Sequence, residues 1–260
     1  MKNEILSHLP EDLLWQIHWF DTIDSTNTYL KGLDDAPHGT VVIAGHQTGG
    51  RGRMGRTFDS PNGGIYLSLL LRPRCKPEKL MHLTCAAGVA MCDAVEKTTG
   101  FRPGIKWIND LTAGNRKLGG ILTELSTDPA TGLVNYAVIG IGINCRQLQE
   151  DFPPELQQIA TSLHLVTGTV PDTALLAANM IEALYTMAQN LSSPENTMAV
   201  YRRDCVTLGK EIQVIRLDTV TPARALDVDA QGALVVEYPD GTKAHLCSGE
   251  VSVRGMYGYI

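Results

Sequence analysis

The middle of the chain reads LGGILTELS over Leu118–Ser126 and LVNYAVIGIGINC over Leu133–Cys145. Both runs are rich in apolar and β-branched residues, and the DPATG segment between them, Asp128–Gly132, is typical of a turn. Together they predict two strands that pair as a hairpin. Near the end of the second run Gly140 and Gly142 alternate with isoleucine, so one face of that strand has no side chains. Either a flat ligand lies against this face or a helix packs closely on it.

Further strands and helices flank the hairpin. Two apolar stretches, residues 40–44 and 64–71, predict buried strands upstream of it, and residues 105–107 predict a short one. Four segments have helix-capping residues followed by apolar residues at helical spacing. These segments are residues 24–30, 78–99, 172–191 and 194–205.

The C-terminal part has a different pattern. From Gly209 onward, strands of about five to seven residues alternate with turn sequences at Asp229–Gly232 and Pro239–Gly241. We therefore expect a small all-β domain over residues 207–260, preceded by a larger domain over residues 1–206. The larger domain is expected to be α+β, with a mixed or antiparallel sheet flanked by helices.

The composition is that of an ordinary globular protein. The chain has 260 residues with 43% hydrophobic and 19% charged side chains, and its formal net charge is −6. Such an acidic chain is not expected to bind nucleic acid in general or an anionic membrane. The six cysteines lie far apart and the seven histidines lack metal-ligand spacing, so we expect no metal cluster, prosthetic group or disulfide scaffold. With no signal-like start and no long apolar segment, a cytoplasmic protein is expected.

The strongest functional signal is GGRGRMGR at Gly49–Arg56, which we call the arginine loop. Arginine matches the oxygens of phosphates and carboxylates, and glycine lets backbone amides come close to a ligand, so the pattern predicts an anion-binding loop. The alternative is a solvated basic turn. A dinucleotide-binding turn is not supported, because no helix-forming segment follows and Arg74 stands near the position of the expected acidic residue.

Other polar segments stand at the ends of predicted strands in a fixed order. They are Ser25–Asn27, Gln47, the arginine loop, KWIND at Lys106–Asp110, RKLGG at Arg116–Gly120 and GIGIN at Gly140–Asn144. In this order and spacing the sequence resembles the catalytic domain of biotin protein ligases, from about Phe20 to GEVSVR at Gly249–Arg254. One departure is Ile108, where the family usually has proline. Another is that only about twenty residues precede this domain, so a helix-turn-helix and DNA binding are not expected.

The resemblance implies a fold and an activity. The fold is that of class II aminoacyl-tRNA synthetases and of biotin and lipoate ligases, with a small SH3-like β-barrel at the C-terminus. The enzyme would join biotin to ATP in the presence of Mg²⁺ and release pyrophosphate. It would then pass biotin from biotinyl-5′-AMP to a lysine of a biotin carboxyl carrier protein domain. Because a carboxylate has to approach a triphosphate, catalysis would consist largely of positioning and neutralisation of charge.

The resemblance also implies roles for single residues. Those expected to bind biotin are Ser25, Thr26, Asn27, Gln47, Arg51, Gly52, Arg53, Lys117, Gly120 and Gly140. Those expected to contact ATP or the adenylate are Arg51, Arg53, Arg56, Trp107, Asn109, Asn144 and Arg254. Lys117, Arg51 and Arg53 are expected to be catalytic, and Asp110 is the candidate ligand for Mg²⁺. An exposed turn position for Lys117 and a core position for Trp107 remain open.

Two other functions remain compatible with the sequence. One is a lipoate or octanoate ligase, since those enzymes resemble the same fold, and the other is a sensor that holds biotinyl-adenylate without transferring biotin. The arginine loop and the KWIND block favour biotin ligation. A homodimer through an exposed edge strand is a further option. We also expect the arginine loop to become ordered only when ligand binds, because its like charges repel and its glycines lose entropy on ordering.

Overall fold

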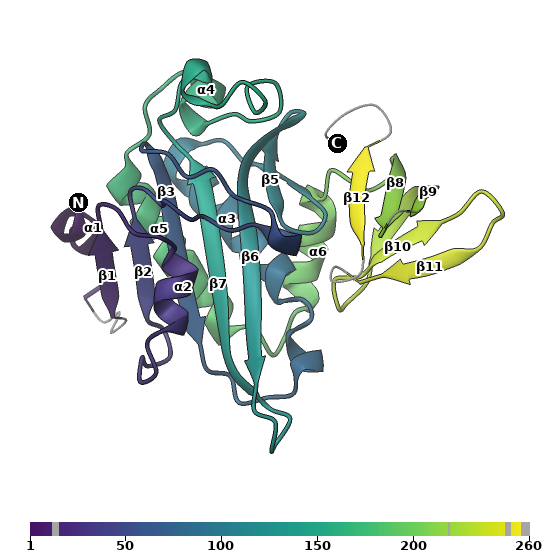
Figure 1. Ribbon diagram of the computed structural model, residues 1–260, viewed down its shortest axis with the longest axis horizontal. Helices are drawn as coiled ribbons and strands as arrows, with labels where there is room; N and C mark the ends of the chain where they lie inside the picture. The colour runs from purple at the N-terminus through teal and green to yellow at the C-terminus, as the bar shows by residue number, and fades with distance from the viewer. Residues whose placement is uncertain (12–15, 218, 248–250, 256–260) are drawn as a thin grey trace.

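The computed structural model describes residues 1–11, 16–217, 219–247 and 251–255, and this part of the chain forms two β-sheets (Figure 1). Over these residues the larger sheet has seven strands in the order β1-β2-β3-β7-β6-β5-β4. β1 runs parallel to β2, and the other neighbouring strands are antiparallel. The strands are β1 (Ile17–Phe20), β2 (Val41–Ala44), β3 (Gly64–Leu71), β4 (Gly104–Lys106), β5 (Asp110–Ala113), β6 (Arg116–Thr127) and β7 (Val134–Asn144). The prediction of an α+β protein with a mixed sheet is confirmed.

The two long central strands, β6 and β7, form the hairpin predicted from the sequence. They pair along β6 from Gly119 to Thr127. At the turn the Asp128 carboxylate accepts a hydrogen bond from the backbone N–H of Ala130 at 2.7 Å, and Gly132 has a φ of 67°. Glycine adopts such a positive φ without the steric cost that a side chain would bring. The hairpin forms the middle of the sheet.

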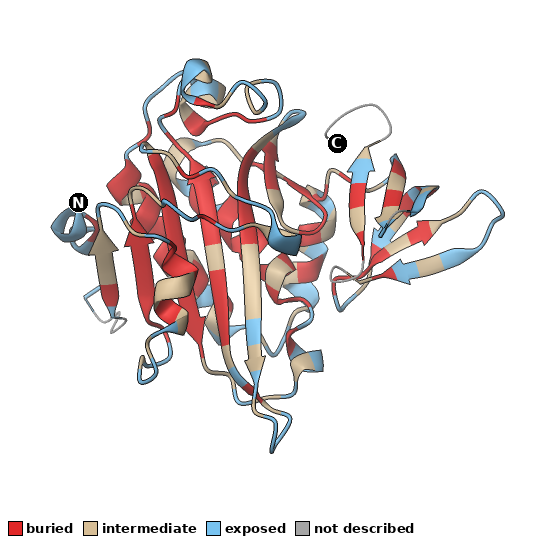
Figure 2. Cartoon of the chain, in the orientation of Figure 1, coloured by how far each residue is buried: buried red, intermediate tan, exposed pale blue. Residues whose placement is uncertain are grey.

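Helices cover both faces of the large sheet. They are α1 (Lys2–Ser7), α2 (Thr26–Lys31), α3 (Leu83–Thr99), α4 (Leu163–Thr167), α5 (Thr173–Gln189) and α6 (Glu195–Asp204). α3, α5 and α6 pack on one face with α1 against α5, whereas α2 packs on the opposite face over β2, β3 and β7 (Figure 1). The strands between these layers are largely buried (Figure 2).

The helix predicted over residues 78–99 is divided in the structure. A 3₁₀ turn at Pro77–Leu80 precedes α3, which begins only at Leu83. The apolar spacing did not reveal this division, because Leu80 and Leu83 are both buried. The elements α1, α4 and β1 were not predicted, and with four to six residues each they are too short to show a periodic pattern.

The second sheet is antiparallel and has the order β11-β10-β9-β8-β12. Its strands are β8 (Glu211–Arg216), β9 (Thr219–Val228), β10 (Leu234–Glu237), β11 (Lys243–Leu246) and β12 (Ser252–Gly255). Gly232 and Gly241 have positive φ angles at the two predicted turns. The indole N–H of Trp107 donates to the backbone carbonyl of Gly232 at 3.0 Å, which connects this sheet to the larger one. Gly249 and Glu250 of the GEVSVR segment lie outside the described residues, and the domain boundary at residue 206 stays a prediction.

All six cysteines are free thiols, and burial raises the pKa of the Cys85, Cys92 and Cys145 thiols, which makes them poor nucleophiles. Within the described residues every helix is too short or too polar to span a membrane.

Candidate active site

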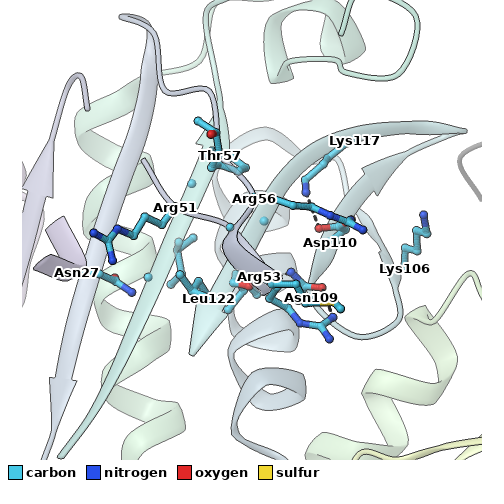
Figure 3. Close-up of a pocket in the computed structure, with 18 of the residues that line it drawn as sticks. Asn27, Arg51, Arg53, Arg56, Thr57, Lys106, Asn109, Asp110, Lys117 and Leu122 are labelled. Atoms are coloured by element: carbon cyan, nitrogen blue, oxygen red, sulfur yellow. Dashed lines mark hydrogen bonds and ion pairs between the residues drawn. The ribbon is translucent and has the colours of Figure 1, made fainter. Parts of the chain in front are cut away.

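A cavity of about 550 Å³ lies on the face of the large sheet that carries α2 (Figure 3). Residues of β6 and β7 form its floor. The arginine loop, the KWIND segment and β12 of the second sheet form its rim. Every residue assigned to the site from the sequence lines this cavity except Asn144. The fold therefore brings together segments from almost the whole length of the chain.

One end of the cavity, which we call the polar end, consists of Ser25, Thr26, Asn27 and Gln47. Ser25 is the N-cap of α2, so the following residues are held at the start of that helix. The backbone N–H of Thr26 donates to Gln47 Oε1 at 2.9 Å, and Gln47 Nε2 donates to Ser60 Oγ at 3.1 Å. Ser25, Thr26 and Asn27 are nearly fully buried. The polar end is thus a hydrogen-bonded set of largely buried donors and acceptors, which suits a neutral polar ligand.

Glycines form the floor of the cavity. A Cβ atom at Gly140 would clash with the Asn27 amide, and one at Gly142 would clash with the Phe58 ring. The third floor glycine, Gly120, would meet Phe58 at 3.2 Å and the Lys117 side chain at 3.3 Å. The glycines therefore line the cavity and also leave room for side chains from α2 and from the segment after the arginine loop. A flat ligand against this strand face stays a prediction.

The arginine loop crosses in front of β7 and β6 and closes on itself (Figure 1). The backbone N–H of Gly52 donates to the carbonyl of Arg56 at 2.7 Å. Arg53 Nη1 donates to Asn109 Oδ1 at 3.1 Å. Burial lowers the pKa of Arg53, Asp110 raises it, and the neighbouring Arg56 lowers it further. In Figure 3 Arg51 turns away from Arg53 and Arg56 and lies beside Asn27.

The other end of the cavity, which we call the cationic end, consists of Arg53, Arg56, Lys106, Lys117 and Arg254. Lys117 Nζ lies 2.6 Å from Asp110 Oδ1 and 5.5 Å from the centre of the Phe58 ring. Asp110 is the only carboxylate among the described residues that line the cavity. This end therefore holds an excess of positive charge, as a site for a polyanion requires.

Lys106 shows the effect of this excess charge most clearly. Its side chain is 7% exposed and stands on β4 directly opposite Asp110 of β5. Burial and the charges of Lys117, Arg254 and Arg56 outweigh the raising effect of Asp110 and together lower the pKa of Lys106 to about 8. A bound anion would relieve this repulsion, because it would supply the opposite charge that the cationic end lacks.

Comparisons with known proteins agree with this geometry. Residues 19–144 match the biotin/lipoate A/B protein ligase family, and residues 207–254 match the C-terminal domain of biotin protein ligases. The chain is 34% identical over 248 residues to the bifunctional ligase/repressor BirA of Bacillus spizizenii, covering 94% of this chain and 74% of that protein. The chain belongs to the biotin protein ligase family.

Two further relatives support this membership. The biotin–[acetyl-CoA-carboxylase] ligase of Mycobacterium tuberculosis is 33% identical over 208 residues, which covers 76% of this chain and 73% of that protein. The biotin protein ligase of Aquifex aeolicus, solved in complex with biotin and ATP, superposes with a TM-score of 0.80 at 27% identity. That superposition covers 92% of this chain and 99% of the other. The fold expected from the resemblance is confirmed.

Two residues expected at the nucleotide in this family have structural partners. Trp107 is 4% exposed, its backbone N–H donates to Thr207 Oγ1 at 2.9 Å, and it also lines the cavity. It is therefore both a core residue and a wall of the site. Asn144 is 6% exposed, and its amide donates to the carbonyl of Thr161 at 2.9 Å. The structure does not bring Asn144 to the cavity, and its assigned contact with the nucleotide stays a prediction.

Several residues that line the cavity were not predicted from the sequence. Phe58 follows the arginine loop by two residues, and only its place between the floor glycines and Lys117 reveals its part in the site. Lys106 lies within the KWIND block, where neither its residue type nor the resemblance indicates a role for it. Leu122, Ile141 and Leu156 add apolar walls. Their apolar side chains are indistinguishable in sequence from core residues, so no signal in the sequence could have marked them.

The fit of the site to Mg²⁺ is limited. Within the described part of the chain, no three His, Cys, Asp or Glu side chains are grouped to hold a metal ion. Asp110 faces the cavity, but its carboxylate is paired with Lys117. These residues do not form a resident metal site. They suit a cation that arrives with the phosphates of a nucleotide, since Mg²⁺ commonly uses one or two carboxylates together with substrate oxygens.

Proposed function

We propose that this protein is an ATP-dependent biotin protein ligase that acts in two steps. In the first, a carboxylate oxygen of biotin attacks the α-phosphorus of ATP, and the bond to pyrophosphate breaks. Biotinyl-5′-AMP remains bound. In the second, the ε-amine of a carrier lysine attacks the acyl carbon, a C–N bond forms, AMP leaves and the amine loses its proton. The carrier is a biotin carboxyl carrier protein domain of a carboxylase.

The observation that carries this proposal is that one cavity has a polar end and a cationic end. The polar end offers fixed hydrogen-bonding groups for the neutral ureido ring of biotin. The cationic end concentrates positive charge where a carboxylate and phosphates have to meet. A site of this kind favours the first step because it neutralises the repulsion between two anions and holds them in line.

In the first step we assign Lys117 and the arginine loop to the reacting groups. Lys117 is held by Asp110 and by Phe58, so its ammonium group is fixed before substrate arrives. Arg51 and Arg53 would contact the biotin carboxylate and the α-phosphate, and Arg56 the outer phosphates. The backbone of Gly52 lies between them on the cavity wall. Such fixed donors stabilise charge that develops in the transition state.

On the nucleotide side we assign Trp107, Asn109 and Arg254. Asn109 is held from both sides, because its Oδ1 accepts from Arg53 and its Nδ2 donates to the carbonyl of Ile121 at 2.9 Å. Arg254 reaches the cavity from β12 of the second sheet. Mg²⁺ would enter as part of the Mg·ATP substrate, with Asp110 as the carboxylate within the cavity.

The decisive experiment is incubation of the protein with biotin, Mg·ATP and a carrier domain, read by intact mass of the carrier and by release of pyrophosphate. We expect the carrier to gain one biotinyl group only when ATP is present. Lys117→Ala and Arg53→Ala should abolish most of this gain. Lys79→Ala and Arg224→Ala remove equivalent charges from exposed positions outside the cavity and should have no effect.

Two outcomes would contradict the proposal. A carrier that gains lipoate or octanoate but not biotin would identify the protein as a ligase for a different acid. Pyrophosphate release without labelling of any carrier would identify a sensor that makes or holds the adenylate alone. Because all six thiols are free, we place the enzyme in the reducing cytoplasm, which localisation of the tagged protein would test.

A further inference from the structure

A row of hydrogen-bonded side chains leads from the polar end of the cavity to Glu124. Among the described residues, Glu124 is not part of the cavity wall. Glu124 Oε2 accepts a hydrogen bond from Asn27 Nδ2 at 2.7 Å, and Asn27 Oδ1 accepts one from Ser68 Oγ at 2.5 Å. Ser68 Oγ also lies 2.7 Å from Thr26 Oγ1, which lies 3.1 Å from Gln47 Oε1. The row thus joins Glu124 to three residues assigned to biotin.

Glu124 is an ionised carboxylate in this arrangement. Its side chain is 29% exposed, and its Oε1 lies 2.6 Å from Lys31 Nζ. Burial raises the pKa of Glu124, but hydrogen bonds from Lys31 and Asn27 and the charges of Lys31 and Arg51 outweigh burial and hold the pKa below its usual value. At neutral pH this side chain can therefore only accept hydrogen bonds.

An acceptor-only partner determines which way round the Asn27 amide lies. The group of Asn27 that faces Glu124 has to be the NH₂, so Oδ1 faces Ser68 and takes the single hydroxyl proton of Ser68. Ser68 Oγ can then only accept from Thr26 Oγ1, which uses the hydroxyl proton of Thr26. Gln47 Oε1 instead accepts a hydrogen bond from the backbone N–H of Thr26. This leaves a second N–H on Asn27 and a lone pair on Thr26, and both residues line the cavity.

We propose that Glu124 is a positioning residue that fixes the donor and acceptor pattern of the polar end and so sets its preference for a cyclic urea. This inference rests on the proposed function. A urea ring presents one carbonyl acceptor and two N–H donors. The free N–H of Asn27 matches the carbonyl, and the Thr26 oxygen matches an N–H. An inverted Asn27 would set its own carbonyl against that of the ring, leaving buried polar groups unpaired.

The floor of the cavity supplies an independent way to disturb the same amide. Asn27 lies directly over Gly140, where any Cβ atom would clash with its Oδ1. Gly140→Ala therefore displaces Asn27 while Glu124 and Lys31 remain intact. Glu182 offers a matched control for Glu124, because its carboxylate also lies 2.6 Å from a lysine, Lys97, on helices far from the cavity.

The experiment compares wild type with Glu124→Gln, Gly140→Ala and Glu182→Gln. It measures kcat and KM for biotin in carrier labelling, and the preference in kcat/KM for biotin over 2-iminobiotin, in which a nitrogen replaces the ureido oxygen. For Glu124→Gln we expect KM to rise about tenfold with kcat within about twofold, and the preference for biotin to fall by about the same factor as KM rises. Glu182→Gln should match wild type in all three quantities.

The possible results test the proposed function and the role of Glu124 separately. Wild-type protein that labels no carrier with biotin would overturn the proposed function and this inference with it. With active wild type, an unchanged preference in Glu124→Gln would overturn the inference alone. If Glu124→Gln does not fold, as judged by thermal unfolding, Gly140→Ala decides: a reduced preference supports the positioning of Asn27, and an unchanged one overturns it.

Discussion

The two ends of the cavity differ in how complete they are before any ligand binds. At the polar end, Thr26 is hydrogen-bonded to Gln47, and Ser68 links Thr26 to Asn27. At the cationic end, Asp110 is the one described carboxylate on the cavity wall, against five basic side chains. The polar end thus offers a ligand a preformed pattern, whereas the cationic end has an excess of positive charge that a bound anion would balance. Recognition of biotin and activation of biotin are therefore assigned to separate parts of the site.

The largest effect that follows from this difference concerns Lys117. We expect Lys117→Ala to reduce the rate of adenylate formation by roughly 10³-fold, because it removes an ammonium group fixed beside the reacting phosphate. Binding of biotin at the polar end should change much less. Pyrophosphate release measures the first quantity and equilibrium binding of biotin the second. If both quantities fell equally, the two ends would not have separate roles.

A smaller effect is expected from the floor that the two ends share. Gly142→Val would push the Phe58 ring away from its place beneath Lys117, and we expect kcat/KM for biotin to fall by about 10²-fold because the reacting groups are misplaced. Gly32→Ala is the matched control, since its Cβ would make only ordinary contacts at the end of α2. Normal activity in Gly142→Val would show that Phe58 does not position the lysine.

The difference between the ends also predicts how the arginine loop responds to ligand. Trypsin cleaves after arginine, so Arg51, Arg53 and Arg56 make the loop a substrate for it. With biotin and Mg·ATP present at roughly ten times Kd, cleavage within the loop should slow by about tenfold, since the ligand stabilises the closed loop. Cleavage after the exposed Lys79 should stay unchanged. Equal cleavage of the loop with and without ligand would contradict its closure over the anion.

The smallest expected effect is a pH dependence of nucleotide binding that comes from Lys106. Its folded pKa of about 8 lies below its unfolded value, so the folded protein binds fewer protons than the unfolded chain between about pH 8 and 10.5, and Lys106 makes stability rise with pH in that window. In the same window Lys106 loses its charge, and KM for ATP should rise by a few-fold. Lys106→Met should remove this rise. A variant with the same pH profile as wild type would show that Lys106 does not contact the anion.

The sequence predicted the central hairpin and the anion-binding character of the arginine loop, because both depend on local patterns. Strands 133–145 and 118–126 have apolar runs with a turn between them, and the arginine loop concentrates its charges within a few residues. The polar end was reached only through resemblance to a family. Asn144 is the last residue of β7, two residues after Gly142 of the floor, but its amide donates to the carbonyl of Thr161, which no local pattern shows.

Glu124 illustrates the part that could not be predicted. Its partner Asn27 lies 97 residues away in the sequence, and the two meet because α2 packs across β7 toward β6. In the sequence, Glu124 is a charged residue in an alternating strand, where a solvated position is the ordinary expectation. The role of Glu124 follows from which groups donate and which accept in its hydrogen-bond network. The members of that network come together only in the folded protein.

The central claim is that the two ends form a single site for the joined product of biotin and AMP. Titration calorimetry with biotin, AMP and a non-hydrolysable biotinyl-AMP analogue tests this most directly. We expect biotin alone to bind, and the analogue to bind at least about 10²-fold more tightly than biotin, because one molecule then fills both ends. No heat with biotin, or an analogue that binds no better than biotin, would contradict the account.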